Sequence, residues 1–160
     1  MVSLLVLAGC ASSAAPAASP AASPGAGTVE RVVDGDTIVV SIDGRSETVR
    51  LIGIDTPETV KPNSPVECFG PEASAFTKTL LPEGTAVRLE RDVEARDDYD
   101  RLLAYVYLTA DGTFVNLEIV RQGFAGLLTF PPNVAHVDDF VQAARDAEAS
   151  DLGLWAGCTG

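Results

Sequence analysis

The sequence predicts an α+β fold that is mainly β, and three observations support this prediction. Segments rich in β-branched residues alternate with Asp-Gly pairs up to residue 54, as expected for strands joined by tight turns. Two further strand-like segments follow a helical one in the middle of the chain. Helical spacing of apolar residues returns in the last third of the chain.

The folded part is expected to begin near Thr28. Residues 1–27 contain no charged residue and are dominated by alanine, proline and serine, a composition that cannot build a packed core. We therefore expect a disordered linker over 11–27. The chain has 160 residues, so 133 remain in 28–160, enough for one domain but not comfortably for two.

Five strands are expected. The first three form an antiparallel meander because their connections are short. The strands are expected at 29–33, 37–42, 48–54, 87–91 and 102–108.

Three helices are expected. Pro71 in a first turn, with Glu72 near the positive end of the dipole, starts a helix at Gly70 that ends before Pro82. Two later helices are expected over 116–122 and 137–149. Three strands, a helix, two strands and then helices is the order of a small closed or partly open barrel of the OB type. Fold alone does not establish function.

The charge excludes one class of function. The net charge of −12 lies entirely on residues 28–160, and a polyanion binds mainly through lysine and arginine. A broad nucleic-acid-binding surface is therefore not expected. A bound divalent cation with a few arginines can still make one local positive site on a negative body.

One short span contains such a set of residues. Asp34, Asp36 and Asp55 are acids that can hold a hard cation, Arg50 is a donor fork, and Glu58 is a spare carboxylate. Metal-assisted phosphodiester hydrolysis needs a cation on the phosphate oxygens, a donor for developing charge, and a group that positions water. Arg101 is a second candidate donor.

Each of these residues also has a structural interpretation. Asp34-Gly35 is an ordinary hairpin signal, and Arg50 alternates with apolar neighbours as on the solvent face of a strand. Glu58 is then a solvated charge. Arg101 can pair with a nearby acid instead of phosphate; the candidates are Asp97, Asp98 and Asp100.

Six motifs in order resemble those of the staphylococcal nuclease, or thermonuclease, family. They are Asp34-Gly-Asp-Thr, Val49-Arg-Leu, Ile54-Asp-Thr-Pro-Glu, residues 69–78, Arg101-Leu-Leu-Ala-Tyr and Val120-Arg-Gln-Gly. The match extends over nearly all of residues 28–156. The resemblance implies a five-stranded OB barrel with three helices, and calcium-dependent cleavage of DNA and RNA that leaves 3′-phosphates.

The resemblance also implies a role for each site residue. Asp36, Asp55 and the backbone carbonyl of Thr56 are the expected Ca²⁺ ligands, and Asp34 is a nearby acid that supports the metal site. Calcium suits this set because it takes oxygen ligands in flexible geometry.

The remaining roles concern the reaction and the substrate. Glu58 is the expected general base or water-orienting group, and Arg50 and Arg101 are expected to grip the phosphate. Tyr99 and Phe130 are candidate substrate contacts, since base stacking needs only a π-face. His136 receives no role.

The N-terminus predicts export. Leu7-Ala8-Gly9-Cys10 resembles the lipobox of bacterial lipoprotein signals, so residues 1–10 are interpreted as a signal segment with Cys10 lipidated. We expect a membrane lipoprotein or an extracellular protein, attached to a membrane only through that lipid. Export favours a disulfide between Cys68 and Cys158; the alternative is two unrelated buried thiols.

Two functions from different classes remain. The first is an exported, monomeric, calcium-dependent nuclease. The second is a non-catalytic OB module on the cell surface that binds nucleic acid or protein. The presence of Asp36, Arg50, Asp55, Glu58 and Arg101 together favours the enzyme.

Overall fold

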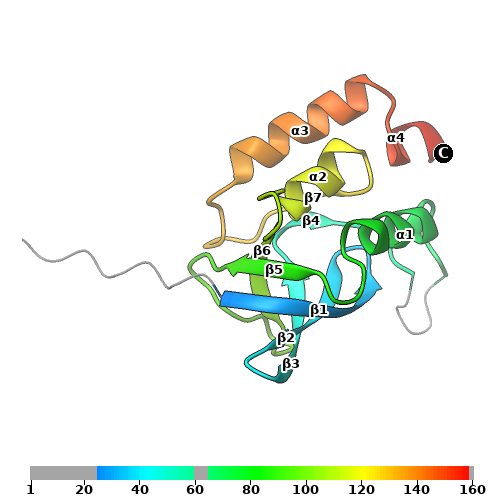
Figure 1. Ribbon diagram of the computed structural model, residues 1–160. Helices are drawn as coiled ribbons and strands as arrows, with labels where there is room; N and C mark the ends of the chain where they lie inside the picture. The colour runs from blue at the N-terminus through cyan, green and yellow to red at the C-terminus, as the bar shows by residue number, and fades with distance from the viewer. Residues whose placement is uncertain (1–24, 60–64, 159–160) are drawn as a thin grey trace, which may run out of the picture.

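Five strands close into a barrel, as predicted. The computed structural model describes residues 25–59 and 65–158. The strand order around the barrel is β1-β2-β3-β6-β5, and Figure 1 shows the barrel below the helices. The strands are β1 (Gly25–Asp34), β2 (Thr37–Ile42), β3 (Arg45–Leu51), β5 (Ala86–Glu90) and β6 (Leu102–Leu108).

The strand register brings the candidate acids and arginines to one end of the barrel. Strands β1, β2 and β3 form the predicted antiparallel meander, and Asp34 pairs with Thr37 across the first turn. Thr37 in turn pairs with Arg50 of β3. Strand β6 runs parallel to β3, with Leu103 beside Arg50. The Asp34 turn, Arg50 and the start of β6 are therefore neighbours.

Two of the barrel strands differ from the prediction by more than one residue. Strand β1 begins at Gly25, so residues 25–27 of the expected linker belong to the barrel, where Gly25 pairs with Leu89 of β5. Composition missed them because backbone pairing requires no apolar side chain. Gly27 also lies so close to the Val40 side chain that a Cβ would clash there.

The predicted third strand, 48–54, is divided in two. Strand β3 ends at Leu51, and the chain continues as β4 (Gly53–Asp55), which pairs with β7 (Gly126–Leu128) in a separate two-stranded sheet. Gly53 has a φ of 84°, a conformation that favours glycine and turns the chain out of the barrel. Strand β7 was not predicted, because three residues carry too little pattern.

A buried asparagine stabilises this division. The amide nitrogen of Asn116 donates to the carbonyl oxygens of Ile52 (3.0 Å) and Ala104 (3.2 Å), and its amide oxygen accepts from the Val106 backbone at 2.9 Å. The side chain thus replaces strand hydrogen bonds where β3 leaves the barrel, since buried backbone groups need partners.

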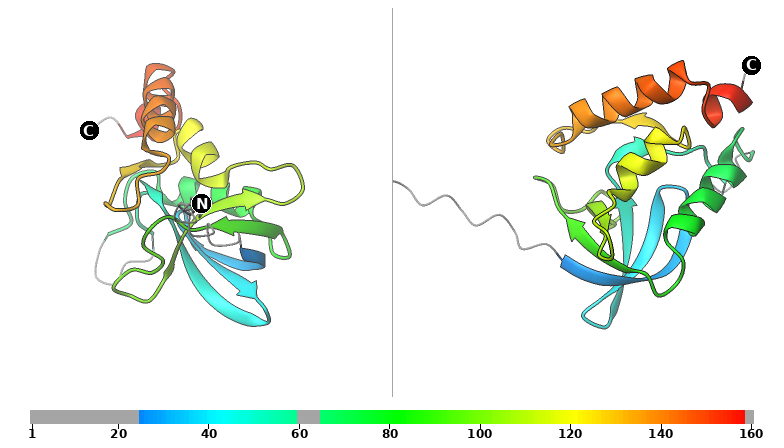
Figure 2. Two further views of the ribbon diagram at one scale, coloured as in Figure 1. Left: turned by 90° about the vertical axis from the view of Figure 1, so that its left-hand side faces the viewer. Right: turned by 45° about the horizontal axis from the view of Figure 1, so that its top comes forward.

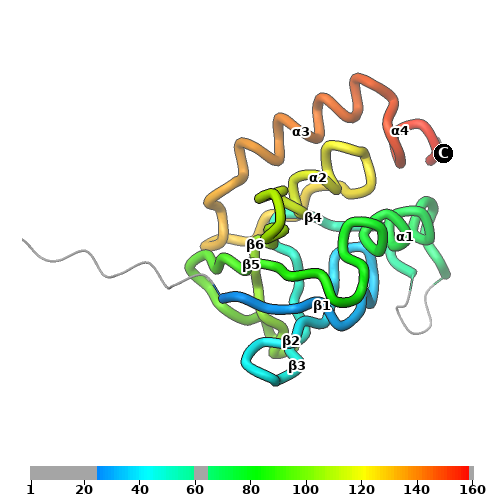
Figure 3. Tube along the Cα trace, viewed as in Figure 1, coloured from blue at the N-terminus to red at the C-terminus, as the bar shows by residue number. Residues whose placement is uncertain are grey.

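The helices cover one side of the barrel. Helices α1 (Gly70–Leu80), α2 (Val115–Arg121) and α3 (Val137–Ala149) agree with the predicted three. A fourth short helix, α4 (Leu154–Gly157), was not predicted. Figures 1 and 2 show α3 lying over α2, and Figure 3 shows the chain after α3 returning toward α1.

The hydrophobic core fills the barrel and extends under α2 and α3. Its largest fully buried side chains include Ile38, Leu51, Ile54, Leu81 and Ile119. Ile54 is buried although Asp55, the next residue, is exposed. The core therefore fixes the backbone directly beneath the candidate site.

The cysteines support one of the two expectations for them. Cys68 and Cys158 are joined by a disulfide, with their Cα atoms 6.0 Å apart. Residues 1–10, with Cys10, and residues 11–24 of the predicted linker lie outside the described residues. Within residues 25–59 and 65–158, no helix has the length and apolar character needed to cross a membrane.

Candidate active site

Two of the predicted metal ligands meet at one arginine nitrogen. Nη2 of Arg50 lies 3.1 Å from Oδ2 of Asp36 and 3.0 Å from Oδ1 of Asp55. Asp36 comes from the β1–β2 turn and Asp55 from the end of β4. The structure therefore brings together three residues that are spread over twenty positions in the sequence.

The Arg50 side chain does not lie on a solvent face. Its Nη1 donates to the carbonyl oxygens of Leu51 (2.7 Å) and Ile54 (2.9 Å), and only 12% of its side chain is exposed. The division between β3 and β4 turns these carbonyls inward. Four acceptors thus hold the guanidinium, and the structural interpretation of Arg50 as a solvated strand residue is wrong.

Asp36 also fixes Thr56, whose carbonyl is a predicted metal ligand. Oδ2 of Asp36 accepts from the Thr56 backbone at 3.0 Å, and Oδ1 accepts from the Thr37 hydroxyl at 2.9 Å. Gly35 lies directly against Thr56, because a Cβ there would be 2.6 Å from the Thr56 hydroxyl oxygen. The Asp34-Gly35 turn is therefore a packing surface for the site as well as a hairpin.

Asp34 holds the segment that carries Glu58. Its Oδ1 accepts from the Thr59 hydroxyl at 2.6 Å and from the Gly35 backbone at 2.9 Å, and its Oδ2 accepts from the Thr59 backbone at 3.1 Å. Both oxygens thus bind neighbouring protein groups. Support of a metal site by Asp34 stays a prediction, and fixing Thr59 is the role that the contacts show.

Glu58 is joined to a residue that sequence reasoning missed. Its backbone nitrogen donates to Oε2 of Glu67 at 3.1 Å, and the Glu67 nitrogen donates to the Glu58 carbonyl at 2.9 Å. Oε1 of Glu58 accepts from the Thr59 backbone at 3.1 Å. Glu67 stands outside the acidic motifs, and only its place before Cys68 could have drawn attention to it.

The oxygen atoms near Arg50 suit a hard cation. Two carboxylates, those of Asp36 and Asp55, are candidate ligands, and that of Asp34 is not. Burial raises the pKa of Asp55, and although Arg50 lowers it, the charges of Asp36 and Glu67 raise it further. Extra positive charge would relieve this crowding. In the described part of the chain, no three His, Cys, Asp or Glu side chains gather in a metal-holding group. Asp36, Asp55 and the Thr56 carbonyl are the oxygen donors that remain.

Arg101 pairs with Asp97, one of its alternative partners. Its Nε lies 2.7 Å from Oδ2 of Asp97, and its backbone nitrogen donates to Oδ1 at 2.9 Å. Burial alone would raise the pKa of Asp97, but the backbone and side-chain hydrogen bonds from Arg101 outweigh it and lower that pKa. The Tyr99 ring lies 5.4 Å from the Arg101 guanidinium carbon.

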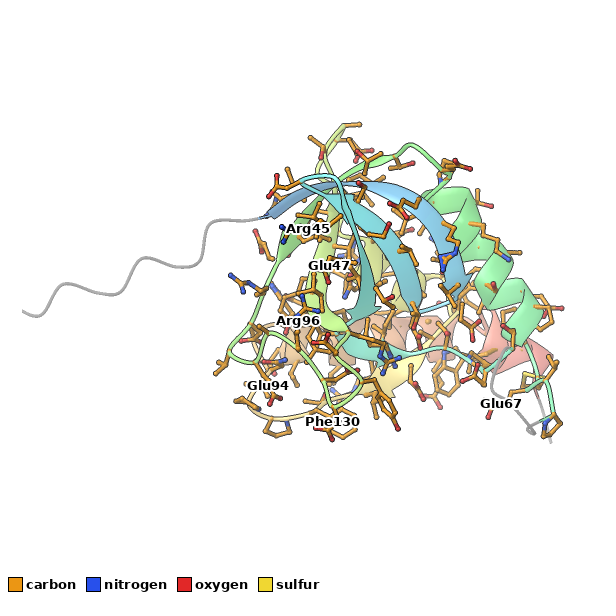
Figure 4. All side chains as sticks on the ribbon, turned by 90° about the horizontal axis from the view of Figure 1, so that it is seen from below. Arg45, Glu47, Glu67, Glu94, Arg96 and Phe130 are labelled. Carbon is orange, nitrogen blue, oxygen red and sulfur yellow. A yellow bond between two sulfur atoms is a disulfide. The ribbon has the colours of Figure 1, made fainter. Side chains whose placement is uncertain are left out.

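One cleft of about 410 Å³ joins both arginines to both candidate substrate contacts. Figure 4 shows Phe130 on the loop next to Glu94, at the edge of the molecule. The cleft residues come from β3, β4, β6, the end of β7, the 94–101 loop and the 130–133 loop. They include Arg50, Arg101, Tyr99, Phe130, Glu94, Asp97 and Asp98. The cleft therefore has a cationic end, an aromatic rim and an acidic wall.

The chain is similar to known nucleases. The model of the family described as "Staphylococcal nuclease homologue" matches residues 48–157. The chain is 48% identical over 127 residues to the thermonuclease of Staphylococcus intermedius, which covers 79% of this chain and 74% of that protein. It is 43% identical over 128 residues to the thermonuclease of Staphylococcus hyicus, with 80% and 74% covered.

The chain belongs to the staphylococcal nuclease family. A third relative, the endonuclease YncB of Bacillus subtilis, is 40% identical over 131 residues, which cover 81% of this chain and 61% of that protein. The residues that match the family model include Arg50, Asp55, Glu58 and Arg101, whereas Asp34 and Asp36 precede them. Membership supports a nuclease as the coarse function.

This family member fixes its cleft wall with a second buried asparagine, which sequence reasoning also missed. Asn133 is 3% exposed; its side chain accepts from the Glu94 nitrogen at 2.8 Å and donates to the Glu94 carbonyl at 3.1 Å. Asp92 adds a bond from the Ala135 nitrogen at 2.9 Å. The two loops that form the cleft are thus fastened together.

His136 lies away from the cleft, in agreement with the absence of a predicted role. It precedes α3, with its Nδ1 3.3 Å from Asp139. Its ring packs edge-on against Tyr105 and Phe114. These contacts are those of a helix-start residue on an aromatic cluster.

Proposed function

We propose that this protein is a calcium-dependent phosphodiesterase that hydrolyses DNA and RNA and leaves 3′-phosphates. One observation carries the proposal: Arg50 is held by four protein acceptors between two carboxylates. The same arginine lines a cleft that also contains Arg101 and two exposed aromatic rings. Family membership and the nuclease names of the relatives support the same activity.

Asp36, Asp55 and the Thr56 carbonyl are the proposed ligands of Ca²⁺. They supply oxygen donors only, which a hard cation prefers. When bound, the cation would draw charge from a phosphate oxygen and neutralise part of the acidic cluster. Desolvation, followed by the charges of Asp36 and Glu67, raises the pKa of Asp55 against the effect of Arg50, so a bound cation would favour its ionised form.

The arginines bind the phosphate in the proposed reaction. A guanidinium fork matches the paired oxygens of a phosphate and stabilises charge as it develops there. Arg50 is already rigid. Arg101 is bound by Asp97 through Nε. The two terminal Nη groups of this cleft-lining side chain are the proposed phosphate donors.

Glu58 supplies the carboxylate that orients water and takes its proton. The water oxygen attacks phosphorus as the bond to the 5′ oxygen breaks. The 5′ oxygen leaves as a hydroxyl with a proton from solvent, and the phosphate stays on the 3′ side. Glu67 fixes both the N–H and the carbonyl of Glu58. The Thr59 N–H, which also binds Asp34, donates to the Glu58 carboxylate. A base in a fixed position contributes more than a strong base in a loose one.

We propose further that the protein acts as a monomer outside the cytoplasm. Lipidation of Cys10 would attach it to a membrane, and the Cys68–Cys158 disulfide is consistent with an oxidising compartment. Mass spectrometry of the membrane fraction would test the lipid: a diacylglyceryl mass on Cys10 supports it, and an unmodified N-terminal peptide contradicts it.

The proposed activity is tested by incubating the protein with single-stranded DNA in calcium, in magnesium and in chelator. We expect cleavage only with calcium, and 3′-phosphate ends by mass spectrometry. Folded protein that cleaves under none of these conditions would favour the non-catalytic binding module instead.

Calcium is also expected to stabilise the fold. It binds the folded site and relieves repulsion between Asp36 and Asp55, so the melting temperature should rise with calcium concentration. The matched variant Asp55→Asn removes a ligand and should lose most of this rise. A wild-type melting temperature indifferent to calcium would contradict the metal assignment.

A further inference from the structure

Glu67 and Glu58 are joined by two hydrogen bonds, and each residue donates one of them. The Glu67 carboxylate accepts the Glu58 N–H at 3.1 Å, and the Glu67 N–H donates to the Glu58 carbonyl at 2.9 Å. The two residues are nine positions apart. Glu67 therefore fixes the backbone of Glu58 from both of its sides.

Glu67 itself is held by its neighbours. Its carbonyl accepts from the Gly70 nitrogen at 3.1 Å, at the start of α1. The next residue, Cys68, is bonded to Cys158 after α4. Figure 4 shows Glu67 on the side of the molecule where the C-terminal helix lies, away from Phe130.

Phe69, the residue after Cys68, fixes the backbone of the segment that carries Glu67. Phe69 has a φ of 67°, which is unusual for a large side chain and requires support from its surroundings. Its ring stacks on Phe124, with centroids 5.4 Å apart. Gly157 approaches the same ring so closely that a Cβ would be 3.1 Å away. The C-terminal turn thus packs on Phe69 as well as bonding to Cys68.

The start of α1 completes the support of Glu58. A Cβ on Gly70 would be 2.8 Å from the Thr59 methyl carbon and 3.1 Å from the Glu58 carbonyl. On the other side, Asp34 binds Thr59. The Glu58 backbone is therefore enclosed by the helix start, the Asp34 turn and Glu67.

We propose that Glu67 is a positioning residue for Glu58, and that the Cys68–Cys158 disulfide keeps Glu67 in place. This inference rests on the proposed function, in which Glu58 acts on the attacking water. Glu67 touches no reacting atom in this account. Its carboxylate determines where the Glu58 backbone lies, so reduction of the disulfide should slow the reaction while the barrel stays folded.

The first test measures the Glu58 amide without reference to activity. Hydrogen exchange at this N–H should speed up roughly fivefold in Glu67→Ala, which removes one hydrogen bond. Glu67→Gln should stay close to the wild type, because the amide oxygen still accepts. An exchange rate unchanged in Glu67→Ala would overturn the proposal, even if the wild type cleaves no DNA.

The second test uses turnover in saturating calcium. Glu67→Ala should lower kcat roughly ten- to a hundredfold with KM little changed, since small displacements of a catalytic group have effects of this size. Glu67→Gln should recover most of the rate. Glu83→Ala, an equal loss of charge in the exposed turn before β5, is the control and should leave kcat unchanged.

A double-mutant cycle separates positioning from general stability. Glu67→Ala should cost nothing further in a Glu58→Gln background, because its effect passes through the Glu58 carboxylate. Losses that multiply would show that Glu67 acts elsewhere and would overturn the proposal. The melting temperature of every variant is measured first, and the assay is run at a temperature at which all of them are folded.

The third test concerns the disulfide. Reductant should lower kcat of the folded wild type toward that of the Cys68→Ser, Cys158→Ser double variant, and should leave the double variant unchanged. Full turnover of the reduced, folded wild type would remove the disulfide from the proposal. An inactive wild type refutes the proposed function instead. Amide exchange at Glu58, measured in Glu67→Ala and in the reduced wild type, still decides whether Glu67 and the disulfide hold Glu58.

Discussion

Arg50 and Arg101 bring the same side chain to the same cleft, but the protein holds them differently. Arg50 is bound by two backbone carbonyls and two carboxylates and is 12% exposed. Among the described residues, Arg101 pairs with one carboxylate, that of Asp97, and its side chain is 31% exposed. The barrel fixes the first guanidinium, whereas a surface loop presents the second. The guanidinium of Arg50 is therefore fixed in position, whereas that of Arg101 is less constrained.

The loop that presents Arg101 has its own framework. Asp97 accepts from the Tyr99 and Arg101 nitrogens at 3.0 and 2.9 Å, and Arg96 donates to the Asp100 carbonyl at 2.6 Å. Arg96 also pairs with Glu47 of β3 at 2.9 Å (Figure 4). The loop is thus tied to the barrel by a half-exposed ion pair and by the Leu103 N–H, which donates to the Ala95 carbonyl at 2.9 Å. A half-exposed ion pair is a weaker connection than the buried contacts of Arg50.

The largest difference is expected for lysine at position 50. Arg50→Lys keeps the charge but cannot reach four acceptors, so kcat should fall roughly 10²–10³-fold. The buried carbonyls left without a donor should lower the free energy of unfolding by about 1–3 kcal/mol. Cleavage rates and urea melts measure both effects. A normal rate would exclude Arg50 from the reaction.

Lysine at position 101 should affect the rate and spare the fold. Arg101→Lys loses part of one charge-assisted contact to phosphate, which corresponds to roughly 10- to 100-fold in rate. The melting temperature should change less than in Arg50→Lys, because Arg101 is more exposed than Arg50 and lysine can still pair with Asp97. Arg31→Lys, on an exposed position of β1, is the control for arginine replacement. Equal loss of stability in Arg50→Lys and Arg101→Lys would contradict the comparison.

The smallest effect is expected for Asp97→Asn, and it depends on pH. The pKa of Asp97 is lowered in the folded protein, so its ion pair stabilises the fold above the unfolded pKa of about 4. This contribution is lost as the pH falls through the folded pKa. Asp97→Asn should therefore lower stability by at most about 1 kcal/mol at neutral pH and not at all in acid.

Asp98→Asn is the matched control for that variant. It removes the same charge from the same cleft wall but leaves the Arg101 pair intact. Both variants should bind DNA more tightly, because a negative charge beside the phosphate is removed. Only Asp97→Asn should lose stability. An equal loss in both would show that the Arg101 pair contributes nothing to the fold.

Most of the fold could be predicted because its signals are local. Alternating β-branched residues, Asp-Gly turns and Pro71 lie within the elements that they specify. The break between β3 and β4 could not be predicted in this way. It depends on Gly53 and on the buried side chain of Asn116, which comes from a helix far along the chain.

The candidate site shows the same limit. The acids and Arg50 could be predicted because they cluster in sequence and match family motifs. The residues that hold them in place could not be predicted, because each contact joins segments that lie apart in the sequence. Asn133 meets Glu94, and Glu67 meets Glu58, only after the loops have packed. The polar residues that hold a site in place carry no motif of their own.

The most direct test of the account is cleavage of single-stranded DNA by Glu58→Gln in saturating calcium. We expect a rate lower by roughly 10²–10⁴-fold, with melting temperature and calcium affinity equal to those of the wild type. Cleavage at the wild-type rate by this variant would contradict it, because the carboxylate that the whole site holds in position would then have no part in the reaction.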